Sequence, residues 1–225
     1  MTSTFKTKTN RTLSILLAFA SLATIFSSCS KTEENKPMAV AGLAVTNAAS
    51  ASAAQDVYFD NQRVTASALA YTQTAGYFSV AGSPTISFRT ANTTDVYGSG
   101  TTSLTPGKYY NAFLSDDKNV TVYENDLTPP QSGKARIRFI NLSSGVGSNA
   151  DFGIAGGAKI VSGLTYRSAS AYQDVDPTSG YSLYTGGSSS VLLAIPVTLT
   201  VGGIYTLYIS GSTNTTVGFK LIGEN

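Results

Sequence analysis

The chain has 225 residues, with 15 basic and 13 acidic side chains, no histidine, no tryptophan and a single cysteine. The absence of histidine excludes Ser-His-Asp catalysis, Cys-His catalysis and histidine-ligated metals, and the single cysteine excludes an internal disulfide. The nearly balanced charge gives no basic surface for nucleic acid. Composition therefore predicts a protein that is not an enzyme, has no cofactor and binds no nucleic acid.

The first 28 residues have the pattern of a secretory signal peptide. Basic residues at positions 6, 8 and 11 precede an apolar run over residues 13–26. This run is about 14 residues long, whereas a helix that crosses a bilayer needs about 20. The small residues Ser27 and Ser28 then lead to Cys29. We therefore predict that residues 1–28 are a cleaved signal peptide.

The only cysteine follows this signal directly. The segment Phe26-Ser27-Ser28-Cys29 resembles a bacterial lipobox, with Phe26 where leucine is usual. The resemblance implies that Cys29 becomes the lipidated first residue of the mature protein, and that its acyl chains anchor the protein to a membrane. An ordinary secreted protein with an unmodified cysteine is the alternative.

Residues 29–37 form a short polar tether after the signal. Within it, Lys31-Thr32-Glu33-Glu34 resembles the acidic export signal of surface-exposed lipoproteins of the Bacteroidota type. This resemblance implies a lipoprotein of the cell envelope that is held in the outer membrane and faces the outside.

The rest of the chain contains an internal repeat. When the sequence is shifted by 95 positions, residues 56–122 align with residues 151–217 without a gap, and 17 of the 67 pairs are identical. A segment rich in proline, glycine and serine separates the copies, and each copy has the length of a small domain. We predict a first repeat over residues 38–126, a linker over 127–133 and a second repeat over 134–225.

Within each copy, apolar and polar residues alternate with a period of two. This pattern covers residues 85–88, 136–139 and 198–201, and turn-forming residues stand at 98–100 and 177–180. Short alternating runs, separated about every 8–12 residues by Gly, Pro and Ser, are typical of β-sandwiches. We therefore predict an all-β protein with two tandem immunoglobulin-like antiparallel β-sandwiches.

A tyrosine follows a turn in each copy. In the first copy, Pro106-Gly107 favours a type II turn, because glycine tolerates a positive φ, and Tyr110 comes soon after it. The second copy has Gly202 and Tyr205 at the matching positions. The arrangement resembles the tyrosine corner of immunoglobulin-like sandwiches, in which the hydroxyl bonds to the upstream backbone. We predict that Tyr110 and Tyr205 are structural residues.

The repeated pattern resembles the uncharacterised domain-of-unknown-function family 4397. The second copy carries more of the pattern than the first, and the two copies together cover nearly all of the mature chain. The resemblance rests on residues 134–141, Asp151, residues 164–166, Tyr172, residues 199–202 and residues 205–208. It implies an exported protein, often a lipoprotein with two tandem copies of the domain, and it implies no activity.

Three short motifs could carry chemistry, but each has a simpler structural interpretation. Ser115 and Lys118 fit S-x-x-K, which needs a helix, whereas the sequence predicts a hairpin tip. Residues 145–150 fit G-x-G-x-x-A, but a strand is expected next in place of the helix that a phosphate-binding loop needs. Asp174 and Asp176 could hold calcium weakly or could cap a turn.

The 13 tyrosines are the remaining candidates for a ligand surface. Among those without a match in the other copy, Tyr58, Tyr97, Tyr181 and Tyr184 are predicted to be exposed. The leading hypothesis is an adhesion or binding module for an unknown glycan or protein, anchored in the membrane through Cys29. The alternative is a structural or accessory subunit of a fimbria-like surface assembly. A glycosidase would need a well-placed pair of carboxylates, which the sequence does not indicate.

Overall fold

Strands form nearly all the regular structure in the part of the chain that the computed structural model describes, which is residues 1–2, 39–147 and 149–224. The predicted all-β class is confirmed, since one 3-10 turn, η1 (Ser144–Val146), is the only helical element among these residues. None of the described residues forms a helix that is long and apolar enough to span a membrane. The predicted cleavage site, Cys29 and the tether lie outside the described residues.

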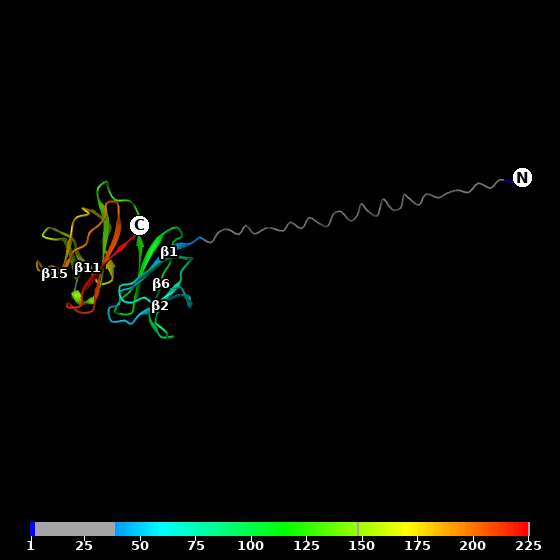
Figure 1. The fold of residues 1–225 in the computed structure, drawn as a ribbon, viewed down its shortest axis with the longest axis horizontal. Helices are drawn as coiled ribbons and strands as arrows, with labels where there is room; N and C mark the ends of the chain where they lie inside the picture. Colours follow the sequence, from blue (N-terminus) through cyan, green and yellow to red (C-terminus); the bar gives the residue numbers. More distant parts are fainter. Residues whose placement is uncertain (3–38, 148, 225) are drawn as a thin grey trace. The chain divides into compact units, whose positions relative to one another are not determined.

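The first half of the described chain, residues 39–126, contains two four-stranded sheets (Figure 1). The strand order is β4-β1-β7-β8 in one sheet and β3-β2-β5-β6 in the other. Strand β1 runs parallel to β7, and the other strand pairs of this half are antiparallel. The strands are β1 (Ala41–Asn47), β2 (Gln55–Phe59), β3 (Gln62–Arg63), β4 (Thr74–Val80), β5 (Thr85–Thr90), β6 (Val96–Thr101), β7 (Tyr109–Leu114) and β8 (Val120–Asn125).

The second half, residues 134–224, has the corresponding strand order. Its sheets are β12-β9-β16-β17, with β13 also paired to β9, and β11-β10-β14-β15. Strand β9 runs parallel to β16, as β1 does to β7, so the sheets are not purely antiparallel as predicted. The strands are β9 (Ala135–Ser143), β10 (Asn149–Ile154), β11 (Lys159–Thr165), β12 (Ser168–Ala169), β13 (Gln173–Val175), β14 (Tyr181–Thr185), β15 (Val191–Ile195), β16 (Ile204–Gly211) and β17 (Gly218–Gly223).

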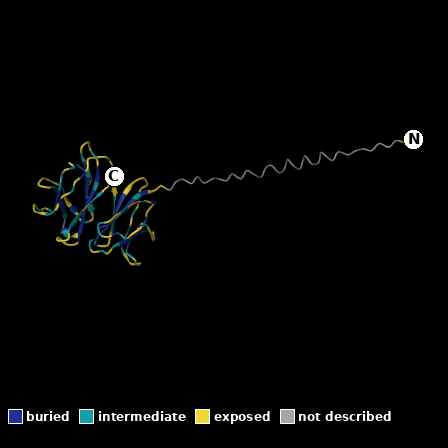
Figure 2. Ribbon diagram, in the orientation of Figure 1, coloured by how far each residue is buried: buried dark blue, intermediate teal, exposed yellow. Residues whose placement is uncertain are grey.

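Each half buries its own apolar core, and the buried residues follow its strands (Figure 2). In the first half, Leu43 and Phe88 are fully buried. In the second half, the ring of Phe139 stacks on that of Phe152 at 4.6 Å and lies 5.4 Å from that of Tyr181. The two cores give each half its own hydrophobic stabilisation, as the alternating sequence pattern requires.

Two local predictions are wrong. Residues 98–100, predicted as a turn, lie within β6, where a Cβ atom at Gly98 would stand 2.4 Å from the backbone oxygen of Lys118. These glycines allow a neighbouring backbone to approach closely and do not end the strand. Residues 198–201, predicted as a strand, lie in the connection between β15 and β16, where Leu199 fills the core without belonging to a sheet.

The tyrosines predicted to be structural lie directly after the turns that lead into β7 and β16. The hydroxyl of Tyr110 accepts a hydrogen bond from the backbone N–H of Thr105 at 3.2 Å, and that of Tyr205 accepts one from Thr200 at 3.0 Å. In the first turn, Gly107 has a φ of 78°, as a type II turn needs. Each tyrosine therefore closes the turn that precedes its own strand.

The two halves meet through a third apolar cluster. Ala48 and Phe113 of the first half pack there with Ile140, Leu142 and Tyr208 of the second, and all five residues are fully buried. The ring centroids of Phe113 and Tyr208 lie 5.1 Å apart. Because of this shared cluster, both halves belong to one compact unit.

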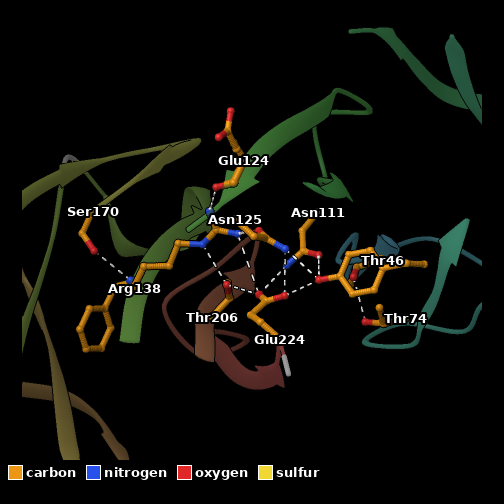
Figure 3. A network of polar contacts seen from close by, with 11 residues as sticks. Thr46, Thr74, Asn111, Glu124, Asn125, Arg138, Ser170, Thr206 and Glu224 are labelled. Carbon is orange, nitrogen blue, oxygen red and sulfur yellow. Dashed lines mark hydrogen bonds and ion pairs between the residues drawn. The ribbon is translucent and has the colours of Figure 1, made fainter. Parts of the chain in front are cut away.

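A buried polar network also joins the two halves (Figure 3). The carboxylate of Glu224, which follows β17, accepts hydrogen bonds from Asn111 Nδ2 at 2.7 Å and from Asn125 Nδ2 at 2.9 Å. The hydroxyl of Tyr77, 2.6 Å away, and that of Thr206 donate to the same carboxylate. Three of these four donors belong to the first half, so one side chain of the second half ties the two together.

Arg138 of β9 supplies the positive charge of this network. Its guanidinium lies 4.0 Å from Glu224, and it donates to the side chains of Thr206 and Asn125 and to a backbone oxygen of β8. Burial lowers the pKa of Arg138. Burial, together with the hydrogen bond to Glu224, raises the pKa of Tyr77, so its hydroxyl remains a neutral donor.

Replacement of Glu224 by alanine is expected to lower the free energy of unfolding by about 3–5 kcal/mol, because Arg138 is left buried without its counter-charge. Urea unfolding of residues 38–225 at pH 7 measures the change. The control is Glu124→Ala, which removes an ion pair to Lys108 that is about half exposed and should cost less than about 1 kcal/mol. Equal losses in the two variants would contradict a special role for the buried network.

Candidate functional site

The three short motifs of the sequence lie in turns and strands. Ser115 and Lys118 are at the tip of the β7–β8 hairpin, where the serine hydroxyl donates to an aspartate and not to the lysine. Residues 145–150 lead from η1 into β10, so a strand follows the glycines. Asp174 forms an ion pair with Arg136. In the described part of the chain, no group of three acidic, cysteine or histidine side chains could hold a metal ion.

The four tyrosines predicted to be exposed do not form a common surface. For Tyr181 and Tyr184 the prediction of exposure is wrong, since they are 1% and 8% exposed, and Tyr181 is part of the second core. Tyr58 and Tyr97 are half-buried. The guanidinium of Arg89 lies over the ring of Tyr58 at 4.1 Å, and a lysine ammonium lies over that of Tyr97 at 5.4 Å.

Two other tyrosines do lie side by side at the surface, and we call them the tyrosine pair. Tyr77 of β4 and Tyr109 of β7 are 39% and 43% exposed. Their ring centroids are 5.3 Å apart, and their planes meet at 86°. Strand β1 runs between β4 and β7, and its residue opposite Tyr109 is Gly42. A Cβ atom there would lie 2.6 Å from the Tyr109 ring, so the glycine makes room for the pair.

The surface is hollowed on both sides of Tyr109. One hollow, of about 280 Å³, is lined by both members of the tyrosine pair and by Ser79. The other, of about 440 Å³, is lined by Tyr109, Glu124 and Asp126. Lys108 borders both hollows. Aromatic rings beside a few polar groups are the usual composition of a small-molecule site.

The charged groups around these hollows are paired with each other or with near neighbours. Lys108 lies 2.9 Å from Glu124, and the hydrogen bond to that carboxylate raises the pKa of the lysine. Asp126 lies 2.6 Å from Arg136. Hydrogen bonds from Thr128, together with that guanidinium, lower the pKa of Asp126, which is therefore ionised at neutral pH. The linings themselves hold one cation, Lys108, and two carboxylates, because Arg136 lines neither hollow and is shared with Asp174. The site is therefore slightly acidic.

In the second half, an arginine occupies the position that corresponds to Gly42. The pairings of β1 with β7 and of β9 with β16 put Arg136 where the first half has Gly42. The guanidinium of Arg136 lies 5.8 Å from the ring of Tyr172, the counterpart of Tyr77, and forms ion pairs with two aspartates at 2.6 and 3.5 Å. The first half therefore has no side chain at a position where the second half carries an arginine. A hollow of about 400 Å³ also borders Tyr172, and Arg138 and Ser170 help to line it.

Sequence reasoning missed this site for two reasons. Tyr77 has a match in the second copy, so it is not among the unmatched tyrosines that are predicted to be exposed. Tyr109 has no matching tyrosine, since it aligns with Ile204, which is buried. However, Tyr109 begins a continuous run of strand-forming residues, and such a run indicates a core strand. The contrast between Gly42 and Arg136 is the signal that could have found the site, and it lies outside the gapless part of the alignment.

The tyrosine pair lies next to the contacts between the two halves. Along β7, Phe113 belongs to the shared apolar cluster, Asn111 to the polar network and Tyr109 to the surface. Alternate residues of a strand point to the same side, so one face of β7 leads from the junction to the site. Tyr77 belongs both to the junction and to the candidate site, because its hydroxyl donates to Glu224 while its ring is partly exposed.

Another hollow, of about 750 Å³, is lined by residues 64–67, 69, 72–76 and 78, and by residues 220–222 of β17. Lys220 is the one charged residue of its lining. The polar side chains of Thr65, Gln73 and Thr74 already form hydrogen bonds within the chain. Phe78 is the one aromatic residue of this lining, so the hollow lacks a pair of exposed rings. We therefore place the candidate site at the tyrosine pair.

The model of the family described as Domain of unknown function (DUF4397) matches residues 41–149. The match spans the first half and the linker and reaches the first residue of β10. It therefore lies mainly on the half that holds the tyrosine pair. From the second half, where the resemblance was expected to be stronger, it takes in only β9, η1 and the start of β10. A search of curated proteins found no match.

Solved structures show limited similarity to the chain. The C-terminal domain of AlgF from P. aeruginosa is 27% identical, with 41% of this chain and 99% of that chain covered and a TM-score of 0.32. A streptococcal virulence factor that binds α-glucan is 12% identical, with coverages of 66% and 82% and a TM-score of 0.28. CBMbc (family CBM26) from Eubacterium rectale Amy13K, in complex with maltoheptaose, is 11% identical, with coverages of 83% and 97% and a TM-score of 0.27. TM-scores this low indicate only a limited likeness of fold.

Two neighbouring tyrosines of β7 should respond differently to truncation. Tyr109→Ala should lower the free energy of unfolding by less than about 1 kcal/mol, because substitutions at exposed side chains usually cost little. Tyr110→Ala should lower it by about 3–5 kcal/mol, because it opens a cavity in the first core and removes the hydrogen bond to Thr105. Urea unfolding of residues 38–225 compares them, and a large loss in Tyr109→Ala would show that this ring is needed for the fold.

Proposed function

We propose that the protein is a non-catalytic binding module of the bacterial cell envelope, and that its ligand binds at the tyrosine pair. One observation carries this proposal. Gly42 leaves the aromatic surface open in the first half, whereas Arg136 fills the same position in the second. If packing alone determined this position, both halves would fill it in similar ways.

The exposure of the two rings supports a binding role. Large aromatic side chains gain free energy when they are buried, so two that stay about two-fifths exposed side by side form a surface that a partner can cover. Tyrosine loses little conformational entropy when it is held, because its side chain has few rotatable bonds. The adjoining hollows supply polar groups that could fix the orientation of a ligand.

We also propose that residues 38–126 and 134–225 are two tandem copies of the DUF4397 domain. The corresponding strand orders of the two halves support this. In this proposal a lipid on Cys29 and the tether of residues 29–37 hold the module at the outer membrane, facing the outside. The lipobox-like sequence before Cys29 supports the anchor, and the second copy acts as the support that holds Tyr77 from behind.

A glycan and matrix-protein array probed with residues 38–225 tests the binding function. We expect at least one reproducible ligand, and Gly42→Arg should abolish its binding, because the new side chain occupies the surface as Arg136 does. The control is Gly180→Arg, which adds the same charge at a glycine where a Cβ atom would have its nearest contact at 3.7 Å. Binding that survives in Gly42→Arg would place the ligand elsewhere.

Native gel electrophoresis of the same protein separates this proposal from the alternative of a structural subunit. A binding module should migrate as one species. A ladder of polymers would instead indicate a subunit of a fimbria-like assembly.

Lipid anchoring can be tested on the full chain in a bacterium that processes lipoproteins. Cells fed a labelled fatty acid should incorporate it into the wild-type protein and not into Cys29→Ser, because the thiol is the acylated group. The wild-type protein should also sediment with membranes and be cut by protease added to intact cells. Label in the serine variant, or a wild-type protein found only in the soluble fraction, would contradict the anchor.

A further inference from the structure

We infer that the ligand of the tyrosine pair is an uncharged oligosaccharide, an inference that rests on the function proposed above. A sugar ring presents C–H groups on its faces and hydroxyl groups around its edge. It therefore suits a site in which exposed aromatic rings lie beside hydrogen-bonding side chains. Tyr77 and Tyr109 supply the rings, and Ser79, Lys108 and Glu124 line the adjoining hollows.

The shape of the site favours a chain of several sugars over a single one. The hollows of about 280 and 440 Å³ lie on the two sides of Tyr109 and share Gly107, Lys108 and Tyr109 in their linings. Taken together they reach the size of common ligand pockets, which is about 300–1,000 Å³. A ligand that passes over Tyr109 can place one sugar in each hollow and stack on the ring between them.

The polar groups at the rim match hydroxyl groups better than they match ions. The side chains of Glu124 and Asp126 are 49% and 47% exposed, so both carboxylates can accept hydrogen bonds from sugar hydroxyls. The side chain of Lys108 is 54% exposed, and its ammonium can donate a hydrogen bond to a sugar hydroxyl. These partners provide both acceptors and donors, as a chain of hydroxyls requires.

The charge of the site argues against an acidic ligand. An anionic sugar would face two carboxylates, and the two cations nearby, Lys108 and Arg136, are already held at 2.9 and 2.6 Å by those carboxylates. Binding an anion would require breaking an existing ion pair and bringing like charges together. An uncharged chain avoids both costs, and its affinity should depend little on salt.

Isothermal titration of residues 38–225 with hexasaccharides tests the ligand class. The probes are the uncharged hexasaccharides of glucose, mannose and galactose, and the acidic hexasaccharide of galacturonic acid. At least one uncharged probe should bind, with a Kd that changes less than about twofold between about 50 and 500 mM NaCl, because paired charges contribute little long-range attraction. The acidic probe should bind at least about tenfold more weakly, as like charges meet at the rim.

Two variants at one position identify the aromatic ring as the contact. Tyr109→Ala should weaken binding of the uncharged probe at least about tenfold, as truncation of an aromatic anchor usually does. Tyr109→Phe should stay within about threefold, because the ring is kept and only the hydroxyl is lost. Unchanged binding in Tyr109→Ala would overturn the inference.

Two further outcomes separate this inference from the function on which it rests. The first outcome is tighter binding of the galacturonic acid probe, or a protein on the array that binds the wild type but not Gly42→Arg. Either result would overturn the inference that the ligand is an uncharged oligosaccharide, but would leave the tyrosine pair as the binding site. If no sugar and no protein binds to residues 38–225, both the inference and the proposed function fail.

Discussion

The arrangement of the two halves depends on one buried carboxylate, that of Glu224. A charge removed from water costs several kcal/mol unless the protein replaces its lost hydrogen bonds. The carboxylate of Glu224 has all its partners only when strands from both halves are in place. These partners are Tyr77, Asn111, Asn125, Arg138 and Thr206. Apolar contacts such as that of Phe113 with Tyr208 stabilise the junction, and the directional hydrogen bonds of the carboxylate fix the alignment of the halves.

This junction also shapes the candidate site, although the second half contributes little to its surface. Tyr77 donates its hydroxyl to Glu224 and accepts a hydrogen bond from Asn125, so two contacts hold the ring from behind. Strand β7, which is separated from β4 by β1, carries Asn111 in the network and Tyr109 at the surface. The second half therefore helps to set the angle between the two tyrosine rings. This gives a physical reason for a binding module to keep both halves.

The sequence predicts the features that depend on neighbouring residues. Alternation with a period of two indicates the strands, and Pro106-Gly107 indicates the turn before β7, because these signals are local. Contacts between distant segments leave no such pattern. From the sequence alone, Gly98 and Gly100 indicate a turn. The reason for a glycine at position 98 is a contact with a distant segment, since a Cβ atom there would lie 2.4 Å from the backbone oxygen of Lys118. In the same way, nothing in the sequence around Glu224 indicates that its partners come from β4, β7, β8, β9 and β16.

The difference between the two halves at the candidate site extends over three neighbouring positions. Gly42 and Ser79 of the first half correspond to Arg136 and Asp174 of the second, and Tyr109 corresponds to Ile204. In the second half the arginine has an acidic partner on the next strand and an aromatic ring beneath it. In the first half both charges are absent, and a tyrosine replaces the buried isoleucine. A random loss of one side chain would leave an unpaired aspartate, whereas here the cation, its counter-charge and the aliphatic residue differ together. The open surface is therefore built from several matched residues, as expected of a site whose exposure serves a purpose.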